Sequence, residues 1–192
     1  MANSMTGHFA TPVYGYESTY GTLSSSVNKT FGNNITITPS ANWGNTHNRG
    51  MGNRNVTQSN IGKFAGALDI EFDLASGYFY KLAVGVVADA SIGGSQFTHT
   101  FTEVNRLTSF SLEVKNDLDT TSVDRYLGCK ITEWTLSGTV GEVIRVSMSA
   151  VYNNASHATS TSNSASEARG TLTFAGGTLS VGGTIADVQS FE

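Results

Sequence analysis

The feature that most constrains the fold is a pair of alternating segments around one glycine-containing turn, GCKITEWTLSGTVGEVIRVSMSAVY at residues 128–152. The side chains on one side of its second arm are those of Ile144, Val146, Met148, Ala150 and Tyr152. Alternation with a period of two is typical of a β-strand with one buried and one solvated face. In the first arm Ile131 and Trp134 break the alternation, which predicts a β-bulge near Thr132 and Glu133. The segment therefore predicts a long β-hairpin.

Glycine and aromatic content extends this interpretation to the whole chain. Among 192 residues there are 21 Gly and 2 Pro, a balance that favours many turns and few helices. The 10 Phe and 7 Tyr residues supply material for one hydrophobic core. A chain of this length usually forms one domain. We expect a mostly β protein, with residues 1–192 as a single domain.

The N-terminal third differs from the rest in composition. Residues 1–21 are rich in Tyr and Gly and predict an extended arm. Residues 22–62 are polar and predict either a functional loop or a disordered segment, with one short strand that ends at Pro39. The alternation in KFAGALDIEFD predicts that the ordered body begins at Lys63.

The segment LASGYFYKLAVGVVADA at residues 74–90 is the best helical candidate in the chain. Apolar residues recur every four positions from Leu74 to Val86, and this spacing favours a helix. Gly77 and Gly85 weaken that prediction, and the alternation of Tyr80 with the apolar residues after it would equally suit a strand. Alternating strands are also predicted at residues 96–103 and 109–117, and a polar loop at residues 153–168.

No residue pattern predicts a catalytic, cofactor-binding or metal-binding site. The four His residues have no second ligand at metal-binding spacing, and the glycine-rich turns lack the Lys and Ser/Thr pair of a phosphate loop. Cys129 has no neighbouring base that would make it a nucleophile. A carboxylate pair of the glycosidase type would need two acids facing each other across a cleft, whereas acids on solvated strand faces need no such arrangement. We therefore interpret the acidic residues as part of solvated strand faces rather than as a catalytic pair.

Charge and hydropathy exclude two further classes of partner. A formal net charge of -4 argues against a protein that grips nucleic acid through its phosphates. No apolar run approaches the ~18 residues that a membrane span requires. The N-terminus has neither the basic region nor the apolar run of a signal peptide, which predicts synthesis in the cytoplasm.

The order of segments resembles a known family. A Tyr/Gly arm (TPVYGYESTYGT), the segment GALDIEFDLASGYFYKLAVG, the strand FTHTFTE, and SFSLEVKNDL followed by RYLGCKITEWTLSGTVGEVIRVSMSAVYN are together similar to the tail tube proteins, or major tail proteins, of long-tailed bacterial and archaeal viruses. The likeness spans residues 10–152 and is strongest over 107–153.

The resemblance implies a β-sandwich or half-barrel with one flanking α-helix, assembled into hexameric rings whose inner strands join as one continuous β-barrel. Stacked rings would form the hollow tail tube of the virion, made in the host cytoplasm, through which the viral DNA passes without sequence-specific binding. The implied partners are further copies of the chain and other tail proteins, namely the tape measure, the terminator or connector, and the tip or baseplate. No enzymatic activity, cofactor or membrane is implied.

Two sets of residues follow from this interpretation. An unbroken strand without proline predicts pairing between subunits through Val143, Ile144, Arg145, Val146, Ser147 and Met148. Carboxylates that alternate with core residues predict an acidic lumen lined by Asp69, Glu71, Glu113 and Glu133, partly offset by Lys115 and Lys130. The cationic residues Lys29, Arg49 and Arg54 predict that residues 23–62 become ordered against an acidic face of a neighbour.

Two other functions are compatible with a polar β-rich chain. A secreted pilus or adhesion filament subunit would explain the Asn-X-Ser/Thr triplets, for example at Asn28 and Asn154, although the absence of a signal peptide counts against it. A glycan-binding β-sandwich would need an exposed aromatic platform, which the pattern does not predict.

Overall fold

The computed structural model describes residues 10–49, 56–60, 62–94, 96–116, 122–162, 170–175, 177–181 and 184–192. The elements in chain order are β1 (Ala10–Tyr16), β2 (Gly32–Asn42), β3 (Thr46–Arg49), β4 (Val56–Asn60), β5 (Ala65–Leu74), the 3-10 helix η2 (Gly77–Phe79), α1 (Tyr80–Ala83), β6 (Gly85–Gly93), β7 (Gln96–Glu103), β8 (Phe110–Asn116), β9 (Val123–Thr139), β10 (Arg145–Tyr152), β11 (Asn154–Ala158), β12 (Gly177–Val181), β13 (Thr184–Val188) and β14 (Ser190–Phe191). The predicted mostly β class is confirmed.

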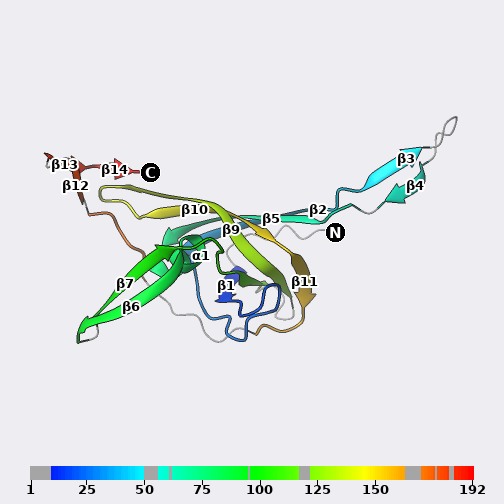
Figure 1. Cartoon of the computed structure of the whole chain (residues 1–192), viewed down its shortest axis with the longest axis horizontal. Helices are drawn as coiled ribbons and strands as arrows, with labels where there is room; N and C mark the ends of the chain where they lie inside the picture. The colour runs from blue at the N-terminus through cyan, green and yellow to red at the C-terminus, as the bar shows by residue number, and fades with distance from the viewer. Residues whose placement is uncertain are drawn as a thin grey trace.

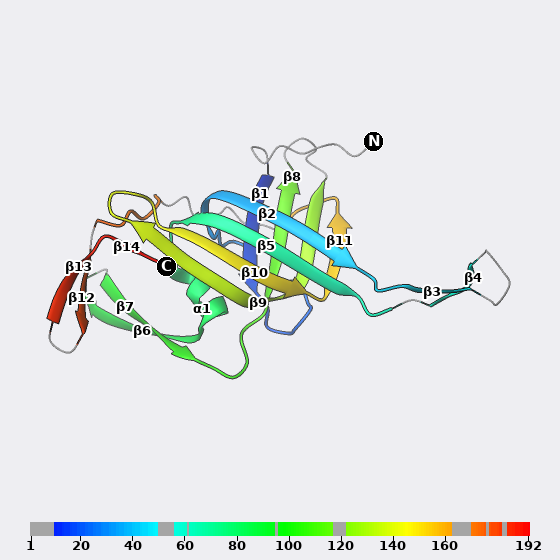
Figure 2. The same ribbon diagram turned by 90° about the horizontal axis from the view of Figure 1, so that it is seen from above.

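One curled antiparallel sheet forms the body of the protein. Its strand order is β1-β8-β9-β10-β5-β2, and β11 and β14 also pair with β9. The first part of β9 pairs with β8 and β11, and the second part pairs with β10. In Figure 2, β1 and β8 run across the direction of β2, β5 and β10, because the long strand β9 carries the sheet from one direction to the other. The result is a half-barrel with one short helix, as the resemblance implied.

The predicted hairpin at residues 128–152 is confirmed and lies at the centre of this sheet. Strands β9 and β10 pair from Arg145 opposite Ser137 onward. The register shifts because Ser149 lies opposite Glu133 while the next residue of β10 lies opposite Ile131. Thr132 is the extra residue, and its Oγ1 donates a hydrogen bond to the carbonyl oxygen of Ser149 at 3.1 Å. The predicted bulge is therefore confirmed at the predicted position.

The hydrophobic core lies between the two arms of the curled sheet. Strands β5 and β10 contribute alternate residues that are at most 2% exposed, Leu68, Ile70, Phe72, Val146, Met148 and Ala150. From the other arm, Tyr14 stacks on Phe31 with ring centroids 4.2 Å apart, and Phe110 meets Phe31 edge to face at 6.0 Å. Burial of each large apolar side chain contributes about 1.5–3 kcal/mol. Because these contacts bury one face of the strands, the opposite, polar face is directed away from the core.

The helical prediction for residues 74–90 is wrong over most of its length. Only η2 and the four residues of α1 are helical, and β6 begins at Gly85. Gly85 has a φ of 143°, and a Cβ there would lie 2.6 Å from the carbonyl oxygen of Thr102 on β7. A close antiparallel approach to β7 therefore ends the helix. The alternation of residues 80–86, which also suited a strand, did not predict β6 either, because Tyr80–Ala83 are helical and only residues 85 and 86 of this stretch lie in β6.

The ordered body also begins earlier than Lys63. Phe31 is fully buried, and β2 continues through Pro39, which lies opposite Leu68 of β5. Proline is tolerated at this position because β2 is the last strand of the sheet. Three two-stranded hairpins, β3–β4, β6–β7 and β12–β13, extend outward from the body (Figure 1). Within the described residues, no helix is long and apolar enough to cross a membrane.

Candidate functional site

Strands β2, β5, β10 and β9 present a polar face on the side of the sheet opposite the core. The side chains that share this face and are exposed or half-buried are those of Thr36, Thr38, Asp69, Glu71, Glu133, Thr135, Ser147 and Ser149. Strand pairing places Ser149 between Asp69 and Glu133. Directly opposite residues of antiparallel strands project to the same face, so three of the four predicted lumen carboxylates, Asp69, Glu71 and Glu133, are brought together.

Hydrogen bonds across neighbouring strands organise this face. Ser149 Oγ donates to Asp69 Oδ1 at 2.8 Å. At the end of the face the nearly buried Asp73 accepts a hydrogen bond from Asn34 Nδ2 at 2.5 Å and lies 3.5 Å from Nε of Arg145, a side chain that is 64% exposed. Sequence reasoning did not single out Asp73 for this role, although its alternation with Glu71 placed it on the same face. The face is thus acidic, with one carboxylate compensated by an arginine.

The structure contradicts the prediction that Glu113 lines an open surface. Glu113 is fully buried, and its Oε1 lies 2.6 Å from Nε of Arg125 on the adjacent strand β9. Thr161 Oγ1 donates to Glu113 Oε2 at 2.9 Å, and Ser162 donates through its backbone N–H at 3.1 Å and through Oγ at 2.9 Å. Glu113 does alternate with core residues, but the segment that follows β11 covers this second face of β8. The carboxylate therefore has a structural role.

The prediction that strand β10 pairs with a neighbouring subunit also needs correction. Arg145, Val146, Ser147 and Met148 are paired on one side with β9 and on the other with β5 of the same chain. The adjacent Ile144 donates its N–H to Leu172 and accepts from the N–H of Leu74. Because both edges of β10 are occupied within the chain, β10 cannot pair with a strand of another subunit.

Two strand edges without a partner strand flank the polar face in the described part of the chain. Strand β2 pairs only with β5, so its outer edge is unpaired. In β9, residues 130–137 pair with β10 on one edge, and β11 continues this edge along residues 123–127, whereas on the other edge β8 stops pairing at Cys129. These two edges bound the four-stranded polar face on its opposite sides. Pro39 was the sequence signal that could have identified β2 as an edge strand.

Strand β14 sets one limit of the β9 edge. Its residues Ser190 and Phe191 pair with Thr139 and Gly138, just beyond residues 130–137. The ring of Phe191 meets Phe174 edge to face at 5.0 Å. A Cβ at Gly138 would lie 2.8 Å from the Phe191 ring, so this close packing requires glycine.

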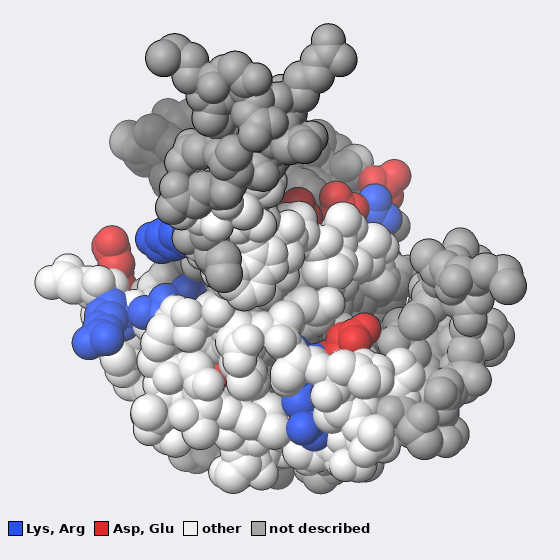
Figure 3. Space-filling model, turned by 90° about the vertical axis from the view of Figure 1, so that its right-hand side faces the viewer, with Lys and Arg blue, Asp and Glu red and all other residues white. Residues whose placement is uncertain are grey.

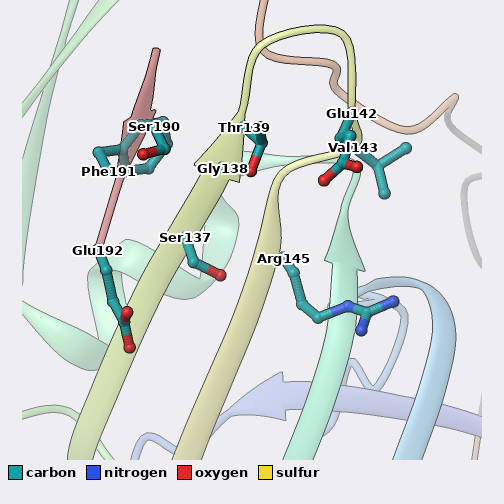
Figure 4. Close-up of a pocket in the computed structure, with 9 residues that line it drawn as sticks. All are labelled: Ser137, Gly138, Thr139, Glu142, Val143, Arg145, Ser190, Phe191 and Glu192. Atoms are coloured by element: carbon teal, nitrogen blue, oxygen red, sulfur yellow. The ribbon is translucent and has the colours of Figure 1, made fainter. Parts of the chain in front are cut away.

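A groove of about 770 Å³ opens beside this end of the polar face (Figure 4). Glu142, Arg145 and Glu192 line it together with hydroxyl groups of Ser137 and Thr139. Such a lining suits hydrogen bonding with a polar chain rather than an apolar ligand. Among the described residues, no group of three His, Cys, Asp or Glu side chains could hold a metal ion.

The remaining electrostatic features are consistent with a non-catalytic surface. Charged side chains are few and scattered on the end of the molecule that faces the viewer in Figure 3, where neutral residues cover most of the described surface. Cys129 is fully buried, and desolvation by burial raises the pKa of its thiol far above the ordinary value. A thiol held in its neutral form is a poor nucleophile.

Comparison with known proteins gives one family match. The model of a family described as "Phage tail tube protein" matches residues 11–192. Among solved structures, the chain is similar to one from "Cryo-EM Structure of an Extracellular Contractile Injection System, PVC sheath-tube complex in extended state". The identity is 8%, the match covers 82% of this chain and 94% of that chain, and the TM-score is 0.47. No curated protein sequence matches the chain.

Proposed function

The chain belongs to the phage tail tube protein family, and from this premise we propose that it polymerises as stacked hexameric rings whose lumen conducts the viral genome to the host. Membership of the family makes it a structural, non-enzymatic protein of the virion tail, and it decides against the pilus and glycan-binding alternatives. The ring number, the passage of DNA and the residues of each interface are the proposed parts.

The observation that carries the ring proposal is the pair of unpaired edges that bounds the polar face. In a ring, β2 of one subunit would pair with residues 130–137 of β9 in the next. Two different edges form a heterologous contact, which closes into a ring when the rotation per subunit permits. Pro39 would limit pairing on β2 to the residues before it, and β14 would limit pairing on β9. This interface replaces the one predicted through residues 143–148.

The polar face would then form the wall of the lumen. Asp69, Glu71 and Glu133 lie exposed on it, and they would repel the phosphates of the passing DNA. DNA carries one negative charge per ~1.7 Å of axis, so a basic wall would bind it by counterion release and oppose sliding. The sequence predicted that Lys115 and Lys130 would partly offset the acidic charge of the wall. In the subunit, Nζ of Lys130 lies 5.2 Å from the ring centroid of Tyr20.

The β3–β4 hairpin is proposed to contact the adjacent ring. The hairpin projects from one end of the molecule in both views (Figures 1 and 2). Of the three cationic residues singled out in the sequence, Lys29 precedes the hairpin, Arg49 is the last residue of β3, and Arg54 lies outside the described residues. Assembly would then protect the β3–β4 hairpin from proteolysis. The sequence predicted this protection for all of residues 23–62, but Val27 and Phe31 are fully buried and β2 pairs with β5 within the subunit, so this part of the segment belongs to the folded body. In this proposal residues 1–192 form one tail tube domain, and its partners in the tail are the tape measure, the terminator or connector, and the tip or baseplate.

Cysteine cross-linking tests the ring proposal. A Cys129→Ser background would carry Thr36→Cys on β2 together with one cysteine at Glu133, Thr135 or Ser137 on β9, so that three registers are sampled. All of these positions lie on the polar face. We expect mild oxidation of assembled protein to give, for one combination, a ladder on a non-reducing gel that ends at a closed hexamer.

The matched control is Thr36→Cys with Ser147→Cys in the same background. Ser147 shares the polar face but lies on β10, whose two edges are occupied within the subunit. No intermolecular ladder is expected from it. Ladders of equal strength in the control, or none from all three β9 positions in preparations that contain tubes, would rule out pairing between these edges.

A further inference from the structure

A cleft of about 480 Å³ lies on a different part of the subunit from the polar face. It is formed by the end of β1, the segment before β2, the η2–α1 segment and the base of the β6–β7 hairpin. The lining side chains with polar or charged groups include those of Tyr16, Lys29, Tyr78, Tyr80, Lys81, Asp89 and His99. None of these residues takes part in the ring contact or the lumen wall proposed above.

Two lysine side chains converge on one tyrosine ring in this cleft. Lys29 Nζ lies 5.0 Å and Lys81 Nζ lies 4.5 Å from the ring centroid of Tyr16. The ring is held in place because Tyr16 donates its hydroxyl hydrogen to the carbonyl oxygen of Tyr78 at 2.8 Å. Cation–π contacts are attractive, but they leave the positive charge of both ammonium groups uncompensated.

The nearby acidic groups do not neutralise the two lysines. Among the described residues, neither Lys29 nor Lys81 lies within ion-pair distance of a carboxylate; the one polar contact of Lys29 Nζ is with Asn28 Oδ1 at 3.1 Å. Asp89 is the one carboxylate in the described lining, and its Oδ1 lies 2.6 Å from Nδ1 of His99 rather than beside either lysine. Burial raises the pKa of Tyr16 to about 12, so its phenol stays neutral near pH 7. The cleft therefore keeps a positive charge in an aromatic surrounding.

We propose that this cleft binds an exposed carboxylate side chain of a second copy of the chain, as a contact between subunits separate from the strand edges. The inference rests on the proposed function, since it requires a polymer. Charge complementarity supports this occupant, because the chain has 15 acidic against 11 basic residues, and several carboxylates away from the polar face are exposed. Among the described residues, the exposed acids outside both the polar face and the cleft are Glu103, Glu142, Asp187 and Glu192.

Removal of the two charges tests the proposal. Lys29→Met/Lys81→Met keeps most of the apolar stems over Tyr16, and Lys63→Met/Arg106→Met removes two exposed cations elsewhere as the control. The critical concentration for tube formation is measured by sedimentation at 50 and 500 mM NaCl. We expect the critical concentration of the cleft variant to be about fivefold higher or more at low salt and to depend much less on salt than that of the wild type. The critical concentration of the control should change little. Tubes of the cleft variant that match the wild type at both salt concentrations would overturn the proposal.

Charge reversal identifies the partner carboxylate. Lys29→Glu/Lys81→Glu is expected to abolish assembly while retaining the circular dichroism spectrum of the wild type. Each of Glu103, Glu142, Asp187 and Glu192 is then changed to Lys in this background, and one of the four is expected to restore tubes. Restoration by none of the four would overturn the assignment of the cleft to these exposed carboxylates of a second copy. Failure of the wild type to form tubes would instead refute the proposed function itself, so the two failures are distinguishable.

Discussion

Replacement of Glu113 by Gln tests the structural role that the fold assigns to this buried carboxylate. Glutamine keeps the shape of the side chain, but its NH2 group cannot accept hydrogen bonds and would face one of the donors from Arg125, Thr161 and Ser162. Removing one partner of a buried ion pair costs about 3–5 kcal/mol. The Arg125 side chain is 21% exposed and can regain some water, so we expect a loss of about 2–3 kcal/mol in the free energy of unfolding.

Urea unfolding of the monomeric subunit, followed by circular dichroism, measures this loss. The matched control is Glu71→Gln, at an exposed position of the polar face, where we expect a change within about 0.5 kcal/mol. In thermal unfolding, the loss for Glu113→Gln corresponds to a fall in Tm of about 4–12 °C for a chain of this length. The difference between the two variants should persist in 0.5 M NaCl, because salt screens buried pairs weakly. Equal stability of Glu113→Gln and Glu71→Gln would refute the assignment of Glu113 to a buried cluster.

Four further outcomes are expected. Val146→Pro should unfold the subunit rather than release folded monomers, because Val146 is paired with both β9 and β5; a native circular dichroism spectrum would contradict this. Phe191→Ala should loosen β14 and speed hydrogen exchange of the Val140 amide, which donates to the carbonyl oxygen of Gln189, about tenfold; unchanged exchange would contradict the packing. Burial raises the pKa of Tyr16 and of Tyr126 to about 12, so the free energy of unfolding should fall as pH rises from about 10, where an unfolded tyrosine ionises, to 12, and phenolate absorbance should appear late in the native titration. Cys129 should react with thiol reagents at pH 8 only after unfolding, and rapid labelling of native protein would argue against its burial.

Local pattern alone was enough to predict the elements in which neighbouring residues decide the conformation. The alternation from Ile144 to Tyr152 predicted β10 and its buried side, since a strand places every second side chain on one face. The break between Ile131 and Trp134 predicted the bulge at Thr132 for the same reason. The order of such segments also carried the resemblance to the tail tube family, which the family match confirms. Local pattern did not predict which edge of a strand pairs with which neighbouring strand.

Long-range contacts decided the rest. The same alternation describes an interior strand and an edge strand, so only the pairing of β10 with both β9 and β5 showed that residues 143–148 cannot join subunits. Glu113 and Glu71 alternate with core residues in the same way, yet Glu113 is buried because the segment after β11 covers its face of the sheet. The strand that replaced the predicted helix at Gly85 depends on its approach to β7. Periodicity reports the two faces of an element, whereas burial of a face and pairing of an edge depend on segments distant in the sequence, and these are fixed only when the chain closes on itself.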